Sequence, residues 1–163
     1  MDDLLIVLLS IIPQLRADRA IALKAVSIDG SMYEKLTQSL RGYEDIALAA
    51  IAVYAPAIGF CAPRLRSARA FVSRAVNLNP SSLQYCLEKF KDDREVILSL
   101  CHSPAATSYE LAQHFSPRLR RDKEVVISFV RRPGCAEAIQ FASEALREDK
   151  EVVLAAVSND GEH

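Results

Sequence analysis

Apolar and basic residues recur together along the chain with a period of 25 to 29 residues. In each period an apolar residue is followed by Arg or Lys, and we call that apolar residue the anchor of its repeat. The anchors are Leu15, Leu40, Leu65, Phe90, Leu119 and Leu146. Internal repetition at this period is typical of solenoid proteins, in which each repeat packs on its neighbours.

Each anchor is followed by the pattern of a short helix. Apolar residues stand six, seven, ten and eleven positions after the anchor, which is helical spacing and not the alternation of a strand. Three positions after the anchor, four repeats have an Asp whose carboxylate can accept hydrogen bonds from the first amide groups of a helix. These residues are Asp18, Asp93, Asp122 and Asp149. The abundance of Val and Ile would allow buried strands, but the spacing and the Asp starts favour helices.

Turn-forming residues follow the first helix of nearly every repeat and predict a second helix after the turn. They are Asp29-Gly30, Asn79-Pro80, Pro104, Pro133-Gly134 and Asp160-Gly161. We expect about ten residues per helix, a length that is marginal in isolation and stable when stacked. The sequence therefore predicts an all-α fold in which helical-hairpin repeats of 25–29 residues stack as an α-solenoid. This single domain, 1–163, has repeats starting near residues 15, 40, 65, 90 and 119 and a half-repeat from 146.

Residues 1–14 are predicted to form an apolar helix, because residues 4–12 are almost entirely Leu, Ile and Val after Asp2 and Asp3. A membrane-spanning helix needs about 20 apolar residues, and a secretory signal begins with basic residues, so we expect neither. The helix has more apolar surface than one neighbouring hairpin can cover. We therefore expect a homodimer, with the C-terminal half-repeat as a second candidate interface. The self-association residues at the N-terminus are Leu4, Leu5, Leu8, Leu9 and Ile12.

Composition narrows the class of protein further. Half of the 163 residues are hydrophobic and a quarter are charged, which excludes wholesale disorder. The formal charge of −1 argues against a protein that coats nucleic acid. The four cysteines form no C-x-x-C pair, which argues against a zinc motif and favours a reducing, cytoplasmic compartment.

Three of the cysteines occupy positions that other repeats fill with core residues, and we expect them to be buried. They are Cys61, Cys86 and Cys101. Cys135 directly follows Pro133-Gly134 and is predicted to be the exposed thiol.

The sharpest enzymatic hypothesis is a Cys101 thiolate with His102 or His114 as its base. Adjacent residues on a helix point about 100° apart, so Cys101 and His102 make a poor nucleophile–base pair. His114 falls where other repeats have a half-buried aromatic residue. The chain also lacks a phosphate-binding loop and metal-ligand spacing. We expect no enzymatic activity, no cofactor and no metal.

Basic residues recur one and four positions after the anchors and would form ridges along stacked repeats. One interpretation is a track for phosphate groups or an acidic partner. The other, which we favour, is that the cations bond to helix-end carbonyls and neighbouring acids. Two stretches carry too few acids for this second interpretation. Their cations are the candidate partner-binding residues: Arg64, Arg66, Arg69, Arg74, Arg118, Arg120, Arg121, Arg131 and Arg132.

Residues 119–130 (LRRDKEVVISFV) and 146–157 (LREDKEVVLAAV) resemble a family of uncharacterised bacterial repeats with the consensus L-R-x-D-K/R-E-V-V-L-x-A-V. Residues 139–146 are similar to its second half and residues 90–98 to a third copy, so the resemblance is most specific from Ser81 onward. It implies helical repeats without an assigned catalytic motif. Because the family occurs among effector-type proteins of intracellular bacteria, the resemblance also implies an interaction role and injection into a host cell.

We therefore expect a non-enzymatic protein-interaction module that acts as an adaptor, inhibitor or regulator of another protein. The alternative is a protein that binds nucleic acid or anionic lipid through the repeated Arg and Lys ridges, although the balanced charge makes nucleic acid the weaker candidate partner. Salt dependence separates the two, because phosphate binding weakens steeply as ionic strength rises.

Overall fold

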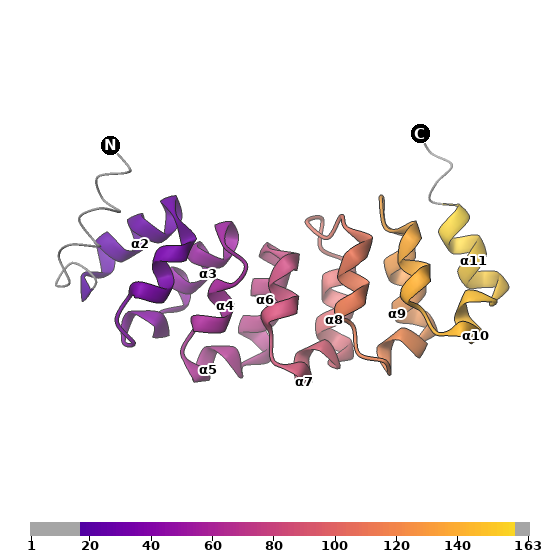
Figure 1. The fold of residues 1–163 in the computed structure, drawn as a ribbon, viewed down its shortest axis with the longest axis horizontal. Helices are drawn as coiled ribbons and strands as arrows, with labels where there is room; N and C mark the ends of the chain where they lie inside the picture. Colours follow the sequence, from indigo (N-terminus) through magenta and orange to yellow (C-terminus); the bar gives the residue numbers. More distant parts are fainter. Residues whose placement is uncertain (1–16, 159–163) are drawn as a thin grey trace. The chain divides into compact units, whose positions relative to one another are not determined.

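A computed structural model describes residues 17–158, which fall into two compact units, residues 17–86 and 87–158. All regular elements in the described range are helical, and each unit repeats a long α-helix, a shorter helical segment and an anchor turn (Figure 1). The predicted all-α fold of stacked helical repeats is confirmed. The expectation of a single domain remains a prediction.

The first unit contains the repeats that begin near residues 15, 40 and 65. Its long helices α2, α3 and α6 contact each other in chain order. The elements are α2 (Arg19–Ile28), η2 (Gly30–Lys35), η3 (Leu40–Gly42), α3 (Glu44–Val53), α4 (Ala57–Phe60), α5 (Pro63–Arg66), α6 (Arg69–Leu78) and η4 (Pro80–Tyr85), where η denotes a 3-10 helix.

The second unit contains the repeats that begin near residues 90, 119 and 146. Here α8 contacts α9, and α9 contacts α11. The elements are α7 (Glu88–Lys91), α8 (Arg94–Cys101), η5 (Tyr109–His114), η6 (Leu119–Arg121), α9 (Lys123–Val130), η7 (Ala136–Phe141), α10 (Glu144–Arg147) and α11 (Lys150–Val157).

The four predicted Asp residues start their long helices as expected. The Asp122 carboxylate accepts a hydrogen bond from the Val125 amide at 3.1 Å, and Asp18 accepts one from Ile21 at 2.9 Å. Asp93 and Asp149 each accept from two amides of the first turn. These bonds satisfy amide groups that have no partner within the helix.

The predicted core positions of the long helices are also confirmed. In the repeats that start near residues 40, 65, 90 and 119, every residue six, seven, ten or eleven positions after the anchor is buried. Ala50 and Ala75, both ten positions after their anchors, are fully buried. Small side chains at this position allow the helices to approach closely.

The prediction of a ten-residue second helix is wrong. A six-residue 3-10 helix occupies this place in four repeats, and a separate anchor turn follows it. The residue four positions before the anchor has an extended backbone and ends the first piece. These buried residues are Leu36, Cys61, Cys86, Phe115 and Ala142.

The chain is held in this extended form by bonds to the preceding repeat. The amide of the next residue donates to a carbonyl in the preceding anchor turn, from Ala62 to Arg41 at 3.1 Å and from Ser143 to Arg120 at 3.0 Å. Because these amides are used between repeats, they are not available for a continuous helix.

The predicted apolar helix at residues 1–14 and the self-association residues Leu4, Leu5, Leu8, Leu9 and Ile12 lie outside the described residues. The same holds for the anchor Leu15 and for the turn Asp160-Gly161. Within residues 17–158, none of the helices has the length and apolar character needed to cross a bilayer.

Candidate interaction site

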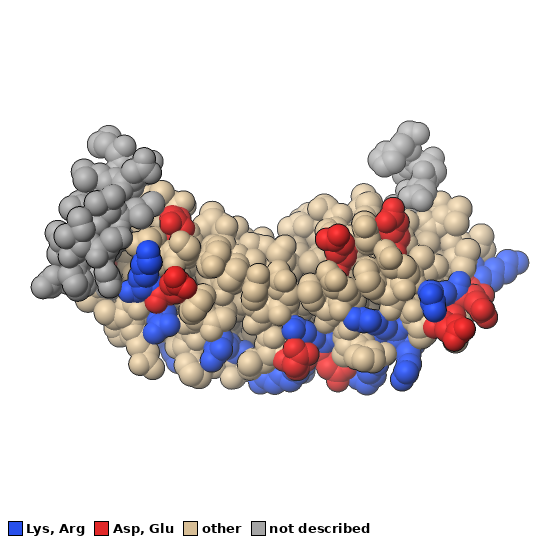
Figure 2. All heavy atoms as spheres, viewed as in Figure 1, with Lys and Arg blue, Asp and Glu red and all other residues tan. Residues whose placement is uncertain are grey.

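The nine predicted partner-binding arginines are divided between the two units. Four lie in the first unit and five in the second, on different helices and turns. Figure 2 shows Lys and Arg gathered on the edge of each unit at which α5, α7 and α10 lie in Figure 1. Many of their guanidinium groups bond within the protein, so the surface holds fewer available cations than the sequence suggests.

Several of these arginines cap backbone carbonyls at the ends of short helices. Arg66 Nη1 donates to the Gly59 carbonyl at 3.0 Å. At the equivalent position of a later repeat, Arg120 Nε donates to the Phe115 carbonyl at 3.0 Å. Arg64 donates to the carbonyl of Gly42. These contacts match the structural role that we favoured from the sequence.

Arg132 joins two consecutive repeats. Its Nε donates to the Ala106 carbonyl at 2.8 Å, and its two terminal nitrogens donate to the carbonyls of Cys101 and Ser103. One guanidinium thus satisfies the carbonyl of the last residue of α8 and two carbonyls of the loop that follows. A planar fork of donors suits this task better than the single ammonium of a lysine.

Two more of the predicted arginines form ion pairs. Arg118 Nε lies 2.9 Å from a carboxylate oxygen of Asp92, and Arg74 pairs with Glu44. The hydrogen bonds that Asp92 accepts from Ser116 and Arg118 hold the pKa of its carboxyl below the usual range. Both arginines are therefore partly neutralised by neighbouring acids.

Arg69, Arg121 and Arg131 have exposed side chains. Among the described residues, Arg121 and Arg131 make no hydrogen bond or ion pair through their guanidinium groups. These two are the predicted site residues that the structure leaves best placed to bind a partner.

Ion pairs link consecutive long helices within each unit. In four repeats, the residue four positions after the anchor pairs with an oppositely charged residue on the next long helix or at its N-cap. The pairs are Arg19–Asp45 (2.7 Å), Glu44–Arg74, Arg94–Asp122 (2.8 Å), Arg94–Glu124, Lys123–Asp149 (2.8 Å) and Lys123–Glu151 (2.9 Å). The bond from Lys123 is the main reason why the pKa of Asp149 lies below its usual range. For Asp122, partial burial acts the other way, and the Arg94 bond still keeps the pKa low.

Lys150 is the corresponding residue of the last described helix, α11. It is exposed and has no ion-pair partner among the described residues. Its helix also carries three exposed apolar side chains: Val153 (37%), Leu154 (54%) and Val157 (63%). We call Lys150, Val153, Leu154 and Val157 the α11 face.

Comparison with earlier repeats shows that the exposure of the α11 face is unusual. Val153 and Val157 stand seven and eleven positions after their anchor, and both positions are buried in all five preceding repeats. The equivalents of Val153 are Ala22, Ala47, Val72, Ile97 and Val126, and those of Val157 are Val26, Ile51, Val76, Cys101 and Val130. In the earlier helices α2, α3, α8 and α9, the next long helix of the same unit packs alongside.

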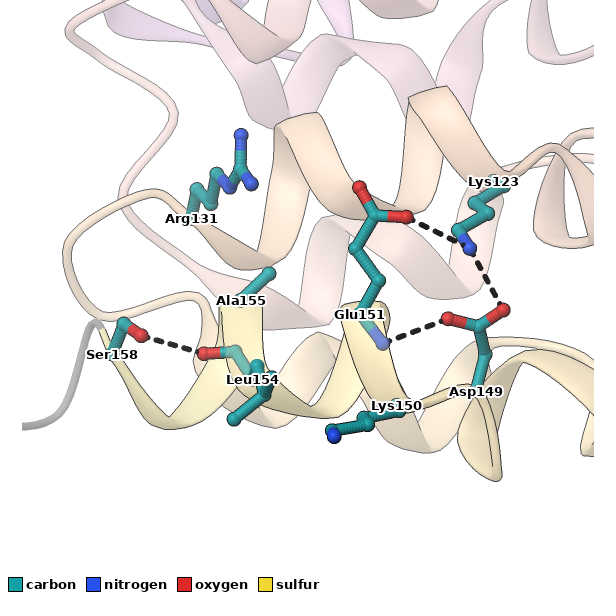
Figure 3. Close-up of a pocket in the computed structure, with 8 residues that line it drawn as sticks. All are labelled: Lys123, Arg131, Asp149, Lys150, Glu151, Leu154, Ala155 and Ser158. Atoms are coloured by element: carbon teal, nitrogen blue, oxygen red, sulfur yellow. Dashed lines mark hydrogen bonds and ion pairs between the residues drawn. The ribbon is translucent and has the colours of Figure 1, made fainter.

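The α11 face adjoins an open groove between α9 and α11 (Figure 3) with a volume of about 910 Å³. Its lining residues are Lys123, Arg131, Asp149, Lys150, Glu151, Leu154, Ala155 and Ser158. Lys123 bonds to Asp149 and Glu151 on one side, whereas Arg131 and Lys150 lie apart from these acids in the close-up. Among the described residues, Arg131 and Lys150 therefore have no ion-pair partner and lie in the groove with the apolar Leu154, which suits an acidic, amphipathic segment.

The sequence pattern could have located this site only in part. The repeat pattern places Lys150, Val153 and Val157 four, seven and eleven positions after the anchor Leu146. Their exposure depends on what packs against α11, and that requires the tertiary structure.

The cysteines are all buried, and the prediction of an exposed Cys135 is wrong. Gly134 has a left-handed backbone (φ 71°), which turns the chain so that Cys135 Sγ lies 3.8 Å from the Ala106 carbonyl. The turn-forming residues Pro133 and Gly134 therefore did not place the thiol of Cys135 in contact with solvent.

Cys101 and His102, two groups of the Cys–His hypothesis, have other environments in the structure. Burial raises the pKa of the Cys101 thiol to about 12, so the thiol is protonated near neutral pH. His102 is exposed, with Nδ1 2.6 Å from the Leu98 carbonyl. The described range also holds no group of three or more His, Cys, Asp or Glu side chains arranged to bind a metal ion.

A family model described as a domain of unknown function (DUF4116) matches residues 18–66, 69–103 and 134–163. These segments cover more than half of the chain, so the chain belongs to this family. The match includes repeats before Ser81, where the sequence resemblance was less specific, and it omits residues 104–133. Neither the curated proteins nor the solved structures contain a match to this chain.

Proposed function

We propose that this member of the DUF4116 family is a non-enzymatic protein-interaction module that binds a partner through the α11 face and the adjoining groove. The observation that carries the proposal is the exposure of Val153, Leu154 and Val157 on one short helix. Burying a Val or Leu side chain contributes about 1.5–3 kcal/mol, and clustered exposed apolar residues mark interaction sites.

The surroundings of the α11 face support a protein partner. Within residues 17–158, Arg131 and Lys150 border the apolar residues and pair with no carboxylate, so they can pair with acids of a bound chain. An apolar centre with charged residues at its rim is the usual composition of a protein–protein interface.

We further propose that the module acts as an adaptor, inhibitor or regulator in a reducing, cytoplasmic compartment. An effector-type role, including injection into a host cell, is the form of this proposal that the sequence resemblance favours. The proposal also includes self-association as a homodimer, because an exposed apolar face can pair with a second copy as well as with another protein.

Affinity capture with matched variants tests the proposed function. The α11 variant combines Lys150→Glu with Leu154→Asp, and the control variant combines Lys24→Glu with Leu78→Asp, which are also exposed. We expect at least one protein from the native or host cell to bind the wild type and the control variant but not the α11 variant after nuclease treatment. Identical captured proteins for all three would refute a partner site on α11.

The second candidate function is binding of nucleic acid or anionic lipid. The observation that favours it is the stretch of residues 46–87, which contains four Arg and no Asp or Glu. Arg64, Arg66 and Arg74 of this stretch are already bonded within the first unit, which weakens the candidate. Fluorescence anisotropy with single-stranded RNA and with anionic vesicles tests it. Binding that falls steeply with salt and with Arg64→Glu and Arg69→Glu would support it.

A further inference from the structure

We propose that the α11 face binds residues 2–12 of a second copy of this chain, so that copies associate head to tail. This inference rests on the proposed function and names the partner of the same site. Its basis is the way in which α2, α3, α8 and α9 are each covered by the next long helix of the same unit.

The contacts between repeats define the chemistry that fits the α11 face. When α9 covers α8 and α11 covers α9, the covering helix starts with acids that pair with the cation of the helix beneath. Arg94 pairs with Asp122 and Lys123 with Asp149 in this way. In the covered helices α8 and α9, the positions seven and eleven residues after the anchor are buried. Lys150, Val153 and Val157 are the same three positions.

A segment of this composition occurs at the start of the chain. Asp2 and Asp3 precede residues 4–12, in which Ser10 is the only polar residue. The same arrangement, an acid pair followed by an apolar run, occurs at Glu44–Val53, which forms α3. There Asp45 pairs with Arg19 of the preceding repeat at 2.7 Å.

The comparison with α3 predicts the orientation of the bound segment. In the Arg19–Asp45 and Lys123–Asp149 pairs, the charged residues lie at the starts of both long helices, so these helices run in the same direction. With Asp2 and Asp3 beside Lys150, residues 4–12 would run along Val153, Leu154 and Val157. Carboxylates at the start of the bound helix also suit its dipole.

Head-to-tail contact has a consequence that a two-fold dimer lacks. The two surfaces are different, so each added copy carries another open α11 face, and association continues into a ring or a chain. A two-fold dimer uses one surface twice and stops at two copies. The two arrangements can therefore be separated with the purified full chain.

Complementation between two blocked variants is the decisive experiment. The α11 variant keeps its N-terminal segment, whereas Leu5→Asp with Leu8→Asp, the N-terminal variant, keeps its α11 face. We expect light scattering to show wild-type masses that rise with concentration beyond twice 18.0 kDa. Each variant alone should remain a monomer, and an equimolar mixture should form a 1:1 heterodimer.

Charge exchange adds a test of the specific pairing. Lys150→Glu alone should weaken association by about tenfold, and Asp2→Lys with Asp3→Lys should restore it in the same chain. The control variant should associate as the wild type does, and circular dichroism should show that all variants retain their helices. A non-specific apolar contact would not respond to the charge exchange.

Every other result overturns the inference. A wild-type monomer at all concentrations excludes self-association, while partner capture lost in the α11 variant would leave the proposed function intact. An α11 variant that still dimerises places the contact elsewhere, and an N-terminal variant that still dimerises indicates α11 paired with α11. Two monomeric variants that fail to combine exclude the proposed pairing.

Discussion

Replacing Arg132 with methionine should destabilise the protein far more than the same change at Arg131. Arg132 donates to three carbonyls, those of Cys101, Ser103 and Ala106, across the contact between two repeats. Its neighbour Arg131 is exposed and makes no side-chain hydrogen bond or ion pair within the described residues. The two positions therefore form a matched pair that differs in tertiary contacts.

The magnitude follows from the bonds that are lost. A hydrogen bond to a charged group contributes about 1.5–3 kcal/mol, and a buried carbonyl left without a donor costs about 1–3 kcal/mol. The three bonds share one guanidinium and the side chain is half-buried, so their contributions are not additive. We expect Arg132→Met to lower the free energy of unfolding by about 2–4 kcal/mol and Arg131→Met to change it by less than about 0.5 kcal/mol.

Urea denaturation followed by far-ultraviolet circular dichroism measures both values. Arg132→Lys should have a free energy of unfolding between those of the wild type and Arg132→Met, because one ammonium cannot reach three carbonyls in the geometry of a guanidinium. Equal stability of Arg132→Met and Arg131→Met would refute the structural role of Arg132. It would return Arg132 to the set of candidate partner-binding residues.

Three further predictions concern the core, the thiols and the ion pairs. Ala50→Leu and Ala75→Leu should each lower the free energy of unfolding by about 1–3 kcal/mol through overpacking. If both variants melt at the same temperature as the wild type, the helix register is wrong. The Cys135 thiol should react with Ellman's reagent only after unfolding, because it is buried and burial raises its pKa; rapid reaction in the native protein would contradict this. Asp149 has a lowered pKa when folded, so its pairing with Lys123 stabilises the protein above the unfolded pKa of about 3.9 and is lost as pH falls through the lower folded value. Asp149→Asn keeps a capping side chain and should melt below the wild type at neutral pH and converge with it in acid, whereas parallel curves would exclude the ion pair.

The candidate site was predicted with mixed success, and the arginines show why. The sequence identified Arg66, Arg120 and Arg132 as candidate partner-binding residues, and it could not assign the groups that they contact. Gly59, Phe115 and Ala106 supply those partners as backbone carbonyls. Every residue has a carbonyl, so sequence composition carries no sign of which one a guanidinium will meet.

The second half of each repeat shows a similar limit of sequence patterns. The apolar residues between turn and anchor fit a continuous helix, but Cys61 and its equivalents have an extended backbone. The hydrogen bond from Ala62 to Arg41 belongs to another repeat. The spacing of apolar residues predicts hydrogen bonds within a helix, but it does not predict hydrogen bonds between repeats.

What the sequence by itself determined is the repeat and the start of each long helix. A helix buries residues at regular spacing, and Asp149 caps α11 through amides only two and three positions away, so both signals are local. Tertiary structure alone decided that Cys135 is buried and that the α11 face is exposed. Burial depends on which segments of the folded chain meet. Val130 and Val157 stand at the same repeat position, but Val130 is buried and Val157 is exposed, because α11 covers only Val130.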